Sequence, residues 1–138
     1  MRGLMPGLVL LSLGGCSLWI PTPNPDQAWI DLQPQNQTQL EALAVDQEQL
    51  RDTRYFQVDP GSRRLDMRTR FTVNAANVGG TEPLQRDCRL SLEYADFSAG
   101  SRYRLVAGGL GFRPWAKLYD ANNNLLARAT ERGCGGAS

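Results

Sequence analysis

The stretch RLDMRTRFTV, residues 64–73, decides the fold. Leu65, Met67 and Phe71 have odd residue numbers, and three arginines and an aspartate have even residue numbers. Such strict alternation is typical of a β-strand with one face on a hydrophobic core and the other in water. The stretch therefore predicts a half-buried antiparallel strand.

The same alternation, bounded by turn residues, recurs along most of the chain. Further strands are expected at 28–32, 40–45, 54–58, 86–97, 102–107, 114–120 and 125–129. Ser98-Ala99-Gly100 is expected to join 86–97 and 102–107 in a hairpin, and Ala121 to Asn124 to join the last two strands. Short strands at this spacing predict an all-β protein, a small antiparallel β-sandwich of about seven strands.

Residues 38–50, TQLEALAVDQEQL, are open to two interpretations. Good helix formers and the apolar residues at 40, 43 and 50 allow a short helix. The alternation around Leu43 and Val45 favours a strand, with residues 46–49 as the turn.

The N-terminus has the features of a secretory signal. Arg2 precedes an apolar stretch from Gly3 to Leu13, which is far shorter than the roughly 20 residues of a membrane-spanning helix. Leu13-Gly14-Gly15-Cys16 resembles a bacterial lipobox, which implies cleavage after residue 15 and acylation of Cys16. Ser17 is not the aspartate that retains enteric lipoproteins at the inner membrane. The resemblance therefore implies the periplasmic face of the outer membrane, with the lipid as membrane anchor.

The lipobox divides the chain into three parts: a cleaved signal peptide (1–15), a lipidated, proline-rich tether (16–26) and a β-sandwich domain with a Gly/Cys tail (27–138). It also accounts for one of the three cysteines. Cys88 and Cys134 then remain as a pair, for which the oxidising periplasm favours a disulfide. Two free thiols are the alternative. Two cysteines without histidine are too few for a tetrahedral zinc site, so we expect no metal and no cofactor.

Two turn regions give a further resemblance. Val58 to Leu65 carries Pro60-Gly61, and Phe97 to Leu105 carries Ala99-Gly100 followed by Tyr103. These steps resemble the small immunoglobulin- or transthyretin-like PEGA domains of bacterial and archaeal envelope proteins. The likeness covers about residues 40–129, lacks the PEGA tetrapeptide itself, and implies a fold rather than an activity.

Charge distribution suggests one binding hypothesis. Net charge is +1, so no bulk field attracts nucleic acid. The 15 cationic residues are all arginine except Lys117, and several arginines project from the outward faces of three strands: Arg64, Arg68, Arg70, Arg89, Arg102 and Arg104. Arginine binds phosphate and carboxylate in a bidentate fork, so these six residues form a candidate anion-binding face. The alternative is a solvated face whose charges pair with Asp66, Glu93 and Asp96.

Other motifs point to structure rather than chemistry. The 138 residues contain no histidine, which excludes a Ser-His-Asp site within them. Residues 108–111, GGLG, lack the lysine of a phosphate loop and are expected to be a flexible connection or a bulge. Phe112, Trp115 and Tyr119 are expected to pack in the core, with an exposed aromatic interface as the alternative.

These observations favour a non-enzymatic binding or assembly module of the outer membrane, with an anionic envelope polymer or a protein as partner and no nucleic acid. The first alternative is an accessory, protein-binding subunit of an envelope machine such as a secretion system, which would use an exposed strand edge. The second is an enzyme that uses the carboxylates of Glu93 and Asp96.

Overall fold

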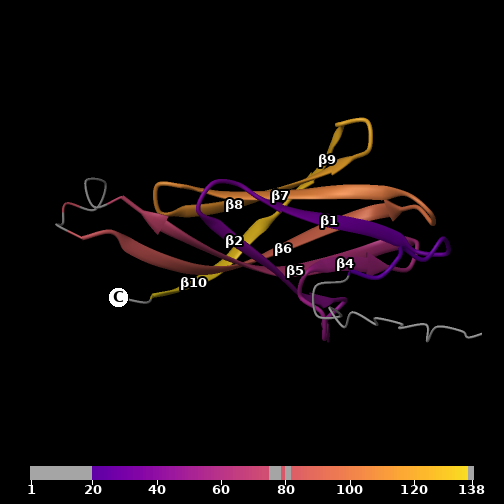
Figure 1. Ribbon diagram of the computed structural model, residues 1–138, viewed down its shortest axis with the longest axis horizontal. Helices are drawn as coiled ribbons and strands as arrows, with labels where there is room; N and C mark the ends of the chain where they lie inside the picture. Colours follow the sequence, from indigo (N-terminus) through magenta and orange to yellow (C-terminus); the bar gives the residue numbers. More distant parts are fainter. Residues whose placement is uncertain (1–19, 75–78, 80–81, 137–138) are drawn as a thin grey trace, which may run out of the picture.

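The computed structural model describes residues 20–74, 79 and 82–136, which form ten β-strands in two five-stranded sheets (Figure 1). The strands are β1 (Ala28–Pro34), β2 (Thr38–Val45), β3 (Glu48–Gln49), β4 (Tyr55–Val58), β5 (Gly61–Val73), β6 (Leu84–Phe97), β7 (Arg102–Leu110), β8 (Arg113–Asp120), β9 (Leu125–Arg128) and β10 (Thr130–Gly136). Sheet A has the order β4-β1-β7-β8-β9, and sheet B the order β10-β6-β5-β2-β3. No helix able to cross a membrane occurs in these ranges.

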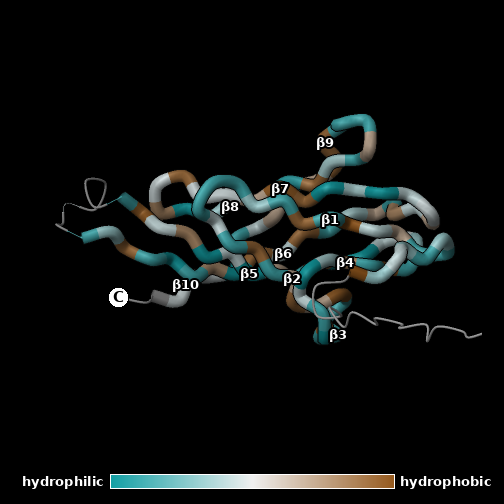
Figure 2. Tube along the Cα trace, in the orientation of Figure 1, coloured by the Kyte–Doolittle hydropathy of each residue, from teal (hydrophilic) through white to brown (hydrophobic). Residues whose placement is uncertain are grey.

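The predicted alternation of residues 64–73 is confirmed in β5. Leu65, Met67, Thr69, Phe71 and Val73 are buried, and the even-numbered residues between them are partly or fully exposed. β5 pairs antiparallel with β2 on one side and with β6 on the other, which makes it the central strand of sheet B. Figure 2 shows hydrophobic and hydrophilic residues alternating along the long strands.

The strand interpretation of residues 38–50 is confirmed by β2, and the helix interpretation is wrong. The turn comprises residues 46–47 rather than the predicted 46–49, because residues 48–49 form β3. β2 and β3 pair antiparallel across Asp46 and Gln47, whose φ angles are 49° and 72°. Two consecutive residues with positive φ form the tight turn that two-residue β-hairpins require. The hairpin of β8 and β9 is also confirmed, with Asn123 at a φ of 66° in its turn.

The predicted hairpin between residues 86–97 and 102–107 is wrong. β6 lies in sheet B and β7 in sheet A, so the chain crosses from one sheet to the other between Phe97 and Arg102. Phe97 and Tyr103 extend from the two sheets into one core, where their rings meet edge to face at 5.1 Å. β7 pairs in parallel with β1, so the architecture is a two-sheet β fold of ten strands that is not wholly antiparallel.

The main hydrophobic core lies between the sheets. Leu65 and Met67 of sheet B pack in one cluster with Leu105 and Leu118 of sheet A. A smaller cluster of Phe71, Val73 and Cys88 extends it along sheet B.

The aromatic residues expected in the core are not there. In β8 the buried positions are Pro114, Ala116 and Leu118, so Trp115 and Tyr119 lie on the opposite, outer face of sheet A. Phe112, in the turn before β8, is 40% exposed. The inward face of an alternating strand is the one that the other sheet covers. An aromatic ring on the solvent face is still stable there when a cation or a glycine packs against the ring.

Residues 108–110 belong to β7 and are not a flexible connection; only Gly111, with a φ of 62°, is in a turn. A Cβ atom on Gly108 would lie 2.8 Å from the Trp115 ring, and one on Gly109 would lie 2.3 Å from the Phe71 ring. The two glycines therefore make room for one ring on each face of the strand.

Candidate functional site

The six arginines of the predicted anion-binding face do not share one face. Arg64, Arg68 and Arg70 of β5 and Arg89 of β6 lie on the outer face of sheet B. Arg102 and Arg104 of β7 belong to sheet A, because the chain changes sheets before β7. The predicted face is therefore divided between opposite sides of the molecule.

Arg68 and Arg70 are engaged by acidic neighbours. Both Nε and Nη2 of Arg68 donate to the carboxylate of Asp87, and Nη2 of Arg70 donates to Oε1 of Glu41 at 2.9 Å. The hydrogen bond from Arg68 lowers the pKa of Asp87 and raises the pKa of Arg68. These two arginines fit the alternative of a paired, solvated face, although Asp87 and Glu41 are not the partners predicted for it.

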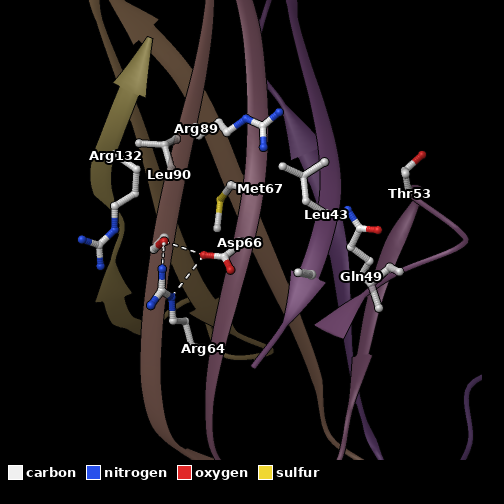
Figure 3. A pocket seen from close by; sticks show the side chains of 12 residues that line it. Leu43, Gln49, Thr53, Arg64, Asp66, Met67, Arg89, Leu90 and Arg132 are labelled. Atoms are coloured by element: carbon white, nitrogen blue, oxygen red, sulfur yellow. Dashed lines mark hydrogen bonds and ion pairs between the residues drawn. The ribbon is translucent and has the colours of Figure 1, made fainter. Parts of the chain in front are cut away.

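Beside this paired ladder, the outer face of sheet B has a pocket of about 450 Å³. The pocket lies over β2, β3, β5, β6 and β10, and Figure 3 shows its side chains. It is lined by Leu43, Ala44, Gln49, Leu50, Thr53, Arg64, Asp66, Met67, Arg89, Leu90, Ser91 and Arg132. Pockets of this volume are large enough for a small ligand or for one group of a larger one.

A closed set of hydrogen bonds holds one side of the pocket. Oδ1 of Asp66 accepts from Nε of Arg64 at 3.2 Å and from Oγ of Ser91 at 2.5 Å. Nη2 of Arg64 donates to Oγ of Ser91 at 3.2 Å (Figure 3). Ser91 is 3% exposed because these partners cover it. The set neutralises one positive charge and fixes the direction of Arg64.

Arg89 and Arg132 have no such partner. The side chain of neither residue makes a hydrogen bond or an ion pair with any residue in the described ranges, although the charge of Arg89 contributes to the lowered pKa of Asp87. With Arg64 balanced by Asp66, the lining therefore carries two uncompensated positive charges. A pocket of this kind favours an anionic group, which two guanidinium forks can bind.

Arg132 was missed by the sequence analysis. It stands in β10, where the pairing with β6 shifts register between Glu131 and Gly133. The Gly-rich tail has no alternation that would predict a strand. The predicted Cys88–Cys134 disulfide is the sequence signal that could have placed Arg132 near Arg89.

The opposite side of the pocket is apolar. Leu43 lies at a register shift between Ala42 and Ala44 in β2, and Leu50 follows β3. Both leucines are only partly buried and line the pocket. The site thus presents cations from β6 and β10 on one side and hydrocarbon from the β2–β3 hairpin on the other.

The predicted disulfide between Cys88 and Cys134 is present and joins β6 to β10. It follows Asp87 and precedes Arg89 on β6, and it lies two residues from Arg132 on β10. The cross-link therefore holds the two strands that carry the unpaired cations.

Arg102 and Arg104 contact residues on the outer face of sheet A. Arg102 binds the carboxylate of Asp31 through two nitrogens, at 2.8 and 3.0 Å, and lowers the pKa of Asp31. Arg104 donates to the side chains of Gln33 and Asn123 and lies 5.1 Å from the centre of the Tyr119 ring. These residues belong to no pocket with Arg64 or Arg89.

Glu93 and Asp96, the carboxylates considered for catalysis, do not line the pocket described above. In the ranges that the structure covers, no group of three histidine, cysteine or carboxylate side chains is placed to hold a metal. Cys16 lies outside the described residues.

Comparison of the chain with protein-family models, with curated proteins and with solved structures finds no match to any of them.

Proposed function

We propose that this protein is a lipid-anchored, non-enzymatic binding module of the bacterial outer membrane, and that it binds an anionic group in the pocket of sheet B. The observation that carries the proposal is the pair Arg89 and Arg132, two cations without a hydrogen-bonded partner in the described ranges, at the edge of a preformed cavity. The lipobox-like residues Leu13 to Cys16 support the anchoring.

The lining indicates what kind of anion fits. Phosphate and carboxylate groups both accept paired hydrogen bonds from guanidinium. Leu43 and Leu50 offer hydrocarbon contact across from the cations, and burial of apolar surface adds about 25 cal/mol for each Å². A ligand with one anionic group beside a short apolar group therefore uses both sides. Lipid-linked phosphates and acidic glycans of the envelope offer such groups.

The binding test uses hexyl phosphate as the probe and residues 17–138 as the protein. This segment contains both core clusters, which lie between Ala28 and Cys134, and is therefore expected to fold. We expect hexyl phosphate to shift the amide NMR signals of Ser91 and Arg132, with hexanol and inorganic phosphate binding more weakly. Arg89→Glu with Arg132→Glu is expected to weaken binding at least about tenfold, because a hydrogen bond to a charged group contributes about 1.5–3 kcal/mol.

The control is Lys117→Glu with Arg128→Glu, which makes the same change of net charge on sheet A. This control should retain hexyl phosphate binding. Equal loss in both double variants would mean that net charge, rather than the pocket, binds the probe.

The anchoring is tested separately in cells. We expect mass spectrometry of the mature protein to find an acylated N-terminal Cys16, and Cys16→Ala to abolish this modification and membrane retention. Recovery of unmodified Cys16 in a soluble fraction would refute the anchor without affecting the pocket.

The exposed hairpin tip between β7 and β8 favours one second candidate, an accessory protein-binding subunit of an envelope machine. Leu110 is 78% exposed and Phe112 is 40% exposed. A photo-crosslinking amino acid at position 110 should capture one dominant protein in cells if this function is correct. The same probe at position 51, which is exposed and remote from the tip in sequence, serves as the control.

A further inference from the structure

The outer face of sheet A has a charge distribution different from that of sheet B. Along β4, β1, β7, β8 and β9 the outward positions carry five cations, namely Arg102, Arg104, Arg113, Lys117 and Arg128. The outward positions of these strands carry one acid, Asp31, which is already bound to Arg102. On sheet B, in contrast, Glu41, Asp66 and Asp87 form ion pairs with the three outward arginines of β5. Arg113 forms an ion pair with Glu131 of β10 at 3.9 Å. The outer face of sheet A, which we term the cationic face, therefore carries a net positive charge from Arg104, Lys117 and Arg128.

Aromatic rings separate and position these cations. Arg102 lies 5.8 Å from the Trp29 ring, and Lys117 lies 5.3 Å from the Trp115 ring. Trp29 also stacks on Tyr55 at 4.4 Å between ring centres and is only 2% exposed. The attraction between a cation and the face of an aromatic ring restrains the position of the cationic side chain.

Apolar contact is available beside the rings. Leu125 of β9 pairs in register with Tyr119 of β8 and is 40% exposed. Val106, opposite Lys117, is partly buried on the same face. Basic residues, Trp, Tyr and a few exposed aliphatic side chains are the composition of protein surfaces that lie at the interface of an anionic membrane.

The N-terminal segment reaches this side of the molecule. The backbone N–H of Asn24 donates to Oε1 of Gln57 at 2.8 Å, and Gln57 is the outward neighbour of Trp29 in the β1–β4 pair. The chain that leads back to Cys16 thus leaves the domain beside the β4 edge of the cationic face. Because Asn24 is only eight residues after Cys16, a lipid on Cys16 keeps the bilayer within about 30 Å of this edge.

We propose that the cationic face of sheet A lies against the headgroups of an anionic bilayer, with Lys117 and the arginines around it bound to lipid phosphates. This inference rests on the proposed membrane anchoring for its setting and is independent of the pocket in sheet B. Binding is additive over the cations, since each basic residue near an anionic surface contributes on the order of 1 kcal/mol.

The test measures sedimentation of residues 17–138, which lack Cys16, with phospholipid vesicles. We expect binding to phosphatidylcholine vesicles that contain about one third phosphatidylglycerol, little binding to pure phosphatidylcholine, and loss of binding in about 0.5 M salt. Lys117→Glu with Arg128→Glu is expected to weaken partitioning at least about tenfold. Leu125→Asp should also weaken it, because the exposed leucine is then replaced by a charge of the same sign as the lipid.

The matched control is Arg51→Glu with Arg86→Glu, which changes net charge equally at residues outside both the cationic face and the pocket lining, and it should keep vesicle binding. Near-ultraviolet circular dichroism checks that each variant is folded. Equal loss in both double variants overturns the proposal in favour of a net-charge effect. Absence of vesicle binding, or binding to the acidic polysaccharide polygalacturonate in its place, overturns it as well.

The two sites give separable results. Hexyl phosphate binding that survives Lys117→Glu with Arg128→Glu, together with vesicle binding lost in the same variant, supports both proposals. Vesicle binding without hexyl phosphate binding refutes only the pocket, and the reverse result refutes only the cationic face.

Discussion

Gly108 and Gly109 illustrate how single residues set the packing of β7. Their missing side chains leave space for Trp115 on the outer face and for Phe71 in the interior. Within a strand, glycine normally weakens the structure because it loses much backbone freedom and packs no side chain. Here the adjacent rings occupy that space, and Gly109 allows a close approach of β7 in sheet A to Phe71 of sheet B.

Gly109→Ala tests this role. Its Cβ would lie 2.3 Å from the Phe71 ring, so we expect a loss of about 1–3 kcal/mol in the free energy of unfolding, as for other overpacked cores. Urea denaturation measures the loss. Adding Phe71→Leu should recover part of it, because the smaller side chain makes room for the methyl group. A fully stable Gly109→Ala would show that the ring moves aside without cost.

At the scale of elements, β10 completes the pocket. This strand is short, rich in glycine and at the edge of sheet B, yet it carries Arg132. Its pairing with β6 is reinforced by the Cys88–Cys134 disulfide, which closes a separation of 46 residues. Edge strands of this kind open readily when no cross-link holds them, so the disulfide is expected to support the pocket as well as the fold.

Cys88→Ala with Cys134→Ala is therefore expected to have two effects. The free energy of unfolding should fall by about 2–4 kcal/mol, and hexyl phosphate should bind more weakly because Arg132 is held less firmly beside Arg89. Calorimetric titration of the folded variant measures the second effect. Lower stability with unchanged affinity would show that the hydrogen bonds between β6 and β10 suffice to place Arg132.

On the scale of the whole molecule, ion pairs occur on both outer faces. Arg68 holds Asp87 on sheet B, and Arg102 holds Asp31 on sheet A. In each case the hydrogen bond from arginine is the main cause that lowers the pKa of the carboxyl. Each half-exposed pair contributes less than about 1 kcal/mol to the free energy of unfolding, but both pairs stabilise the folded state.

The stability of the protein should accordingly decrease at acid pH. A carboxyl whose pKa is lower in the folded state stabilises the fold above its unfolded pKa of about 3.9, and this contribution is lost as the pH falls through the folded pKa. We expect unfolding free energy to be nearly flat from pH 7 to about pH 5 and to fall below about pH 4. Asp87→Asn with Asp31→Asn should reduce this fall, as measured by urea denaturation at each pH. An equally steep fall in the double variant would assign the acid sensitivity to other groups.

Much of the fold was predictable because alternation is a local property. The strand character of residues 64–73, the turn at Asp46 and the β8–β9 hairpin all follow from neighbouring side chains. The Cys88–Cys134 pair was also predictable, since only two cysteines remain once Cys16 is assigned to the lipobox.

The sequence by itself thus determined an all-β chain, most of its strands and its cross-link. Tertiary structure alone decided which sheet each strand joins, because the turn after Phe97 serves equally for a hairpin or for a crossing between layers. That choice separated Arg102 and Arg104 from Arg64 and Arg89. The pairing of β10 with β6 brought Arg132, in a tail without any periodic pattern, to the pocket. Long-range strand pairing depends on the burial of the inner faces of both sheets against each other, and no local window of sequence contains that information.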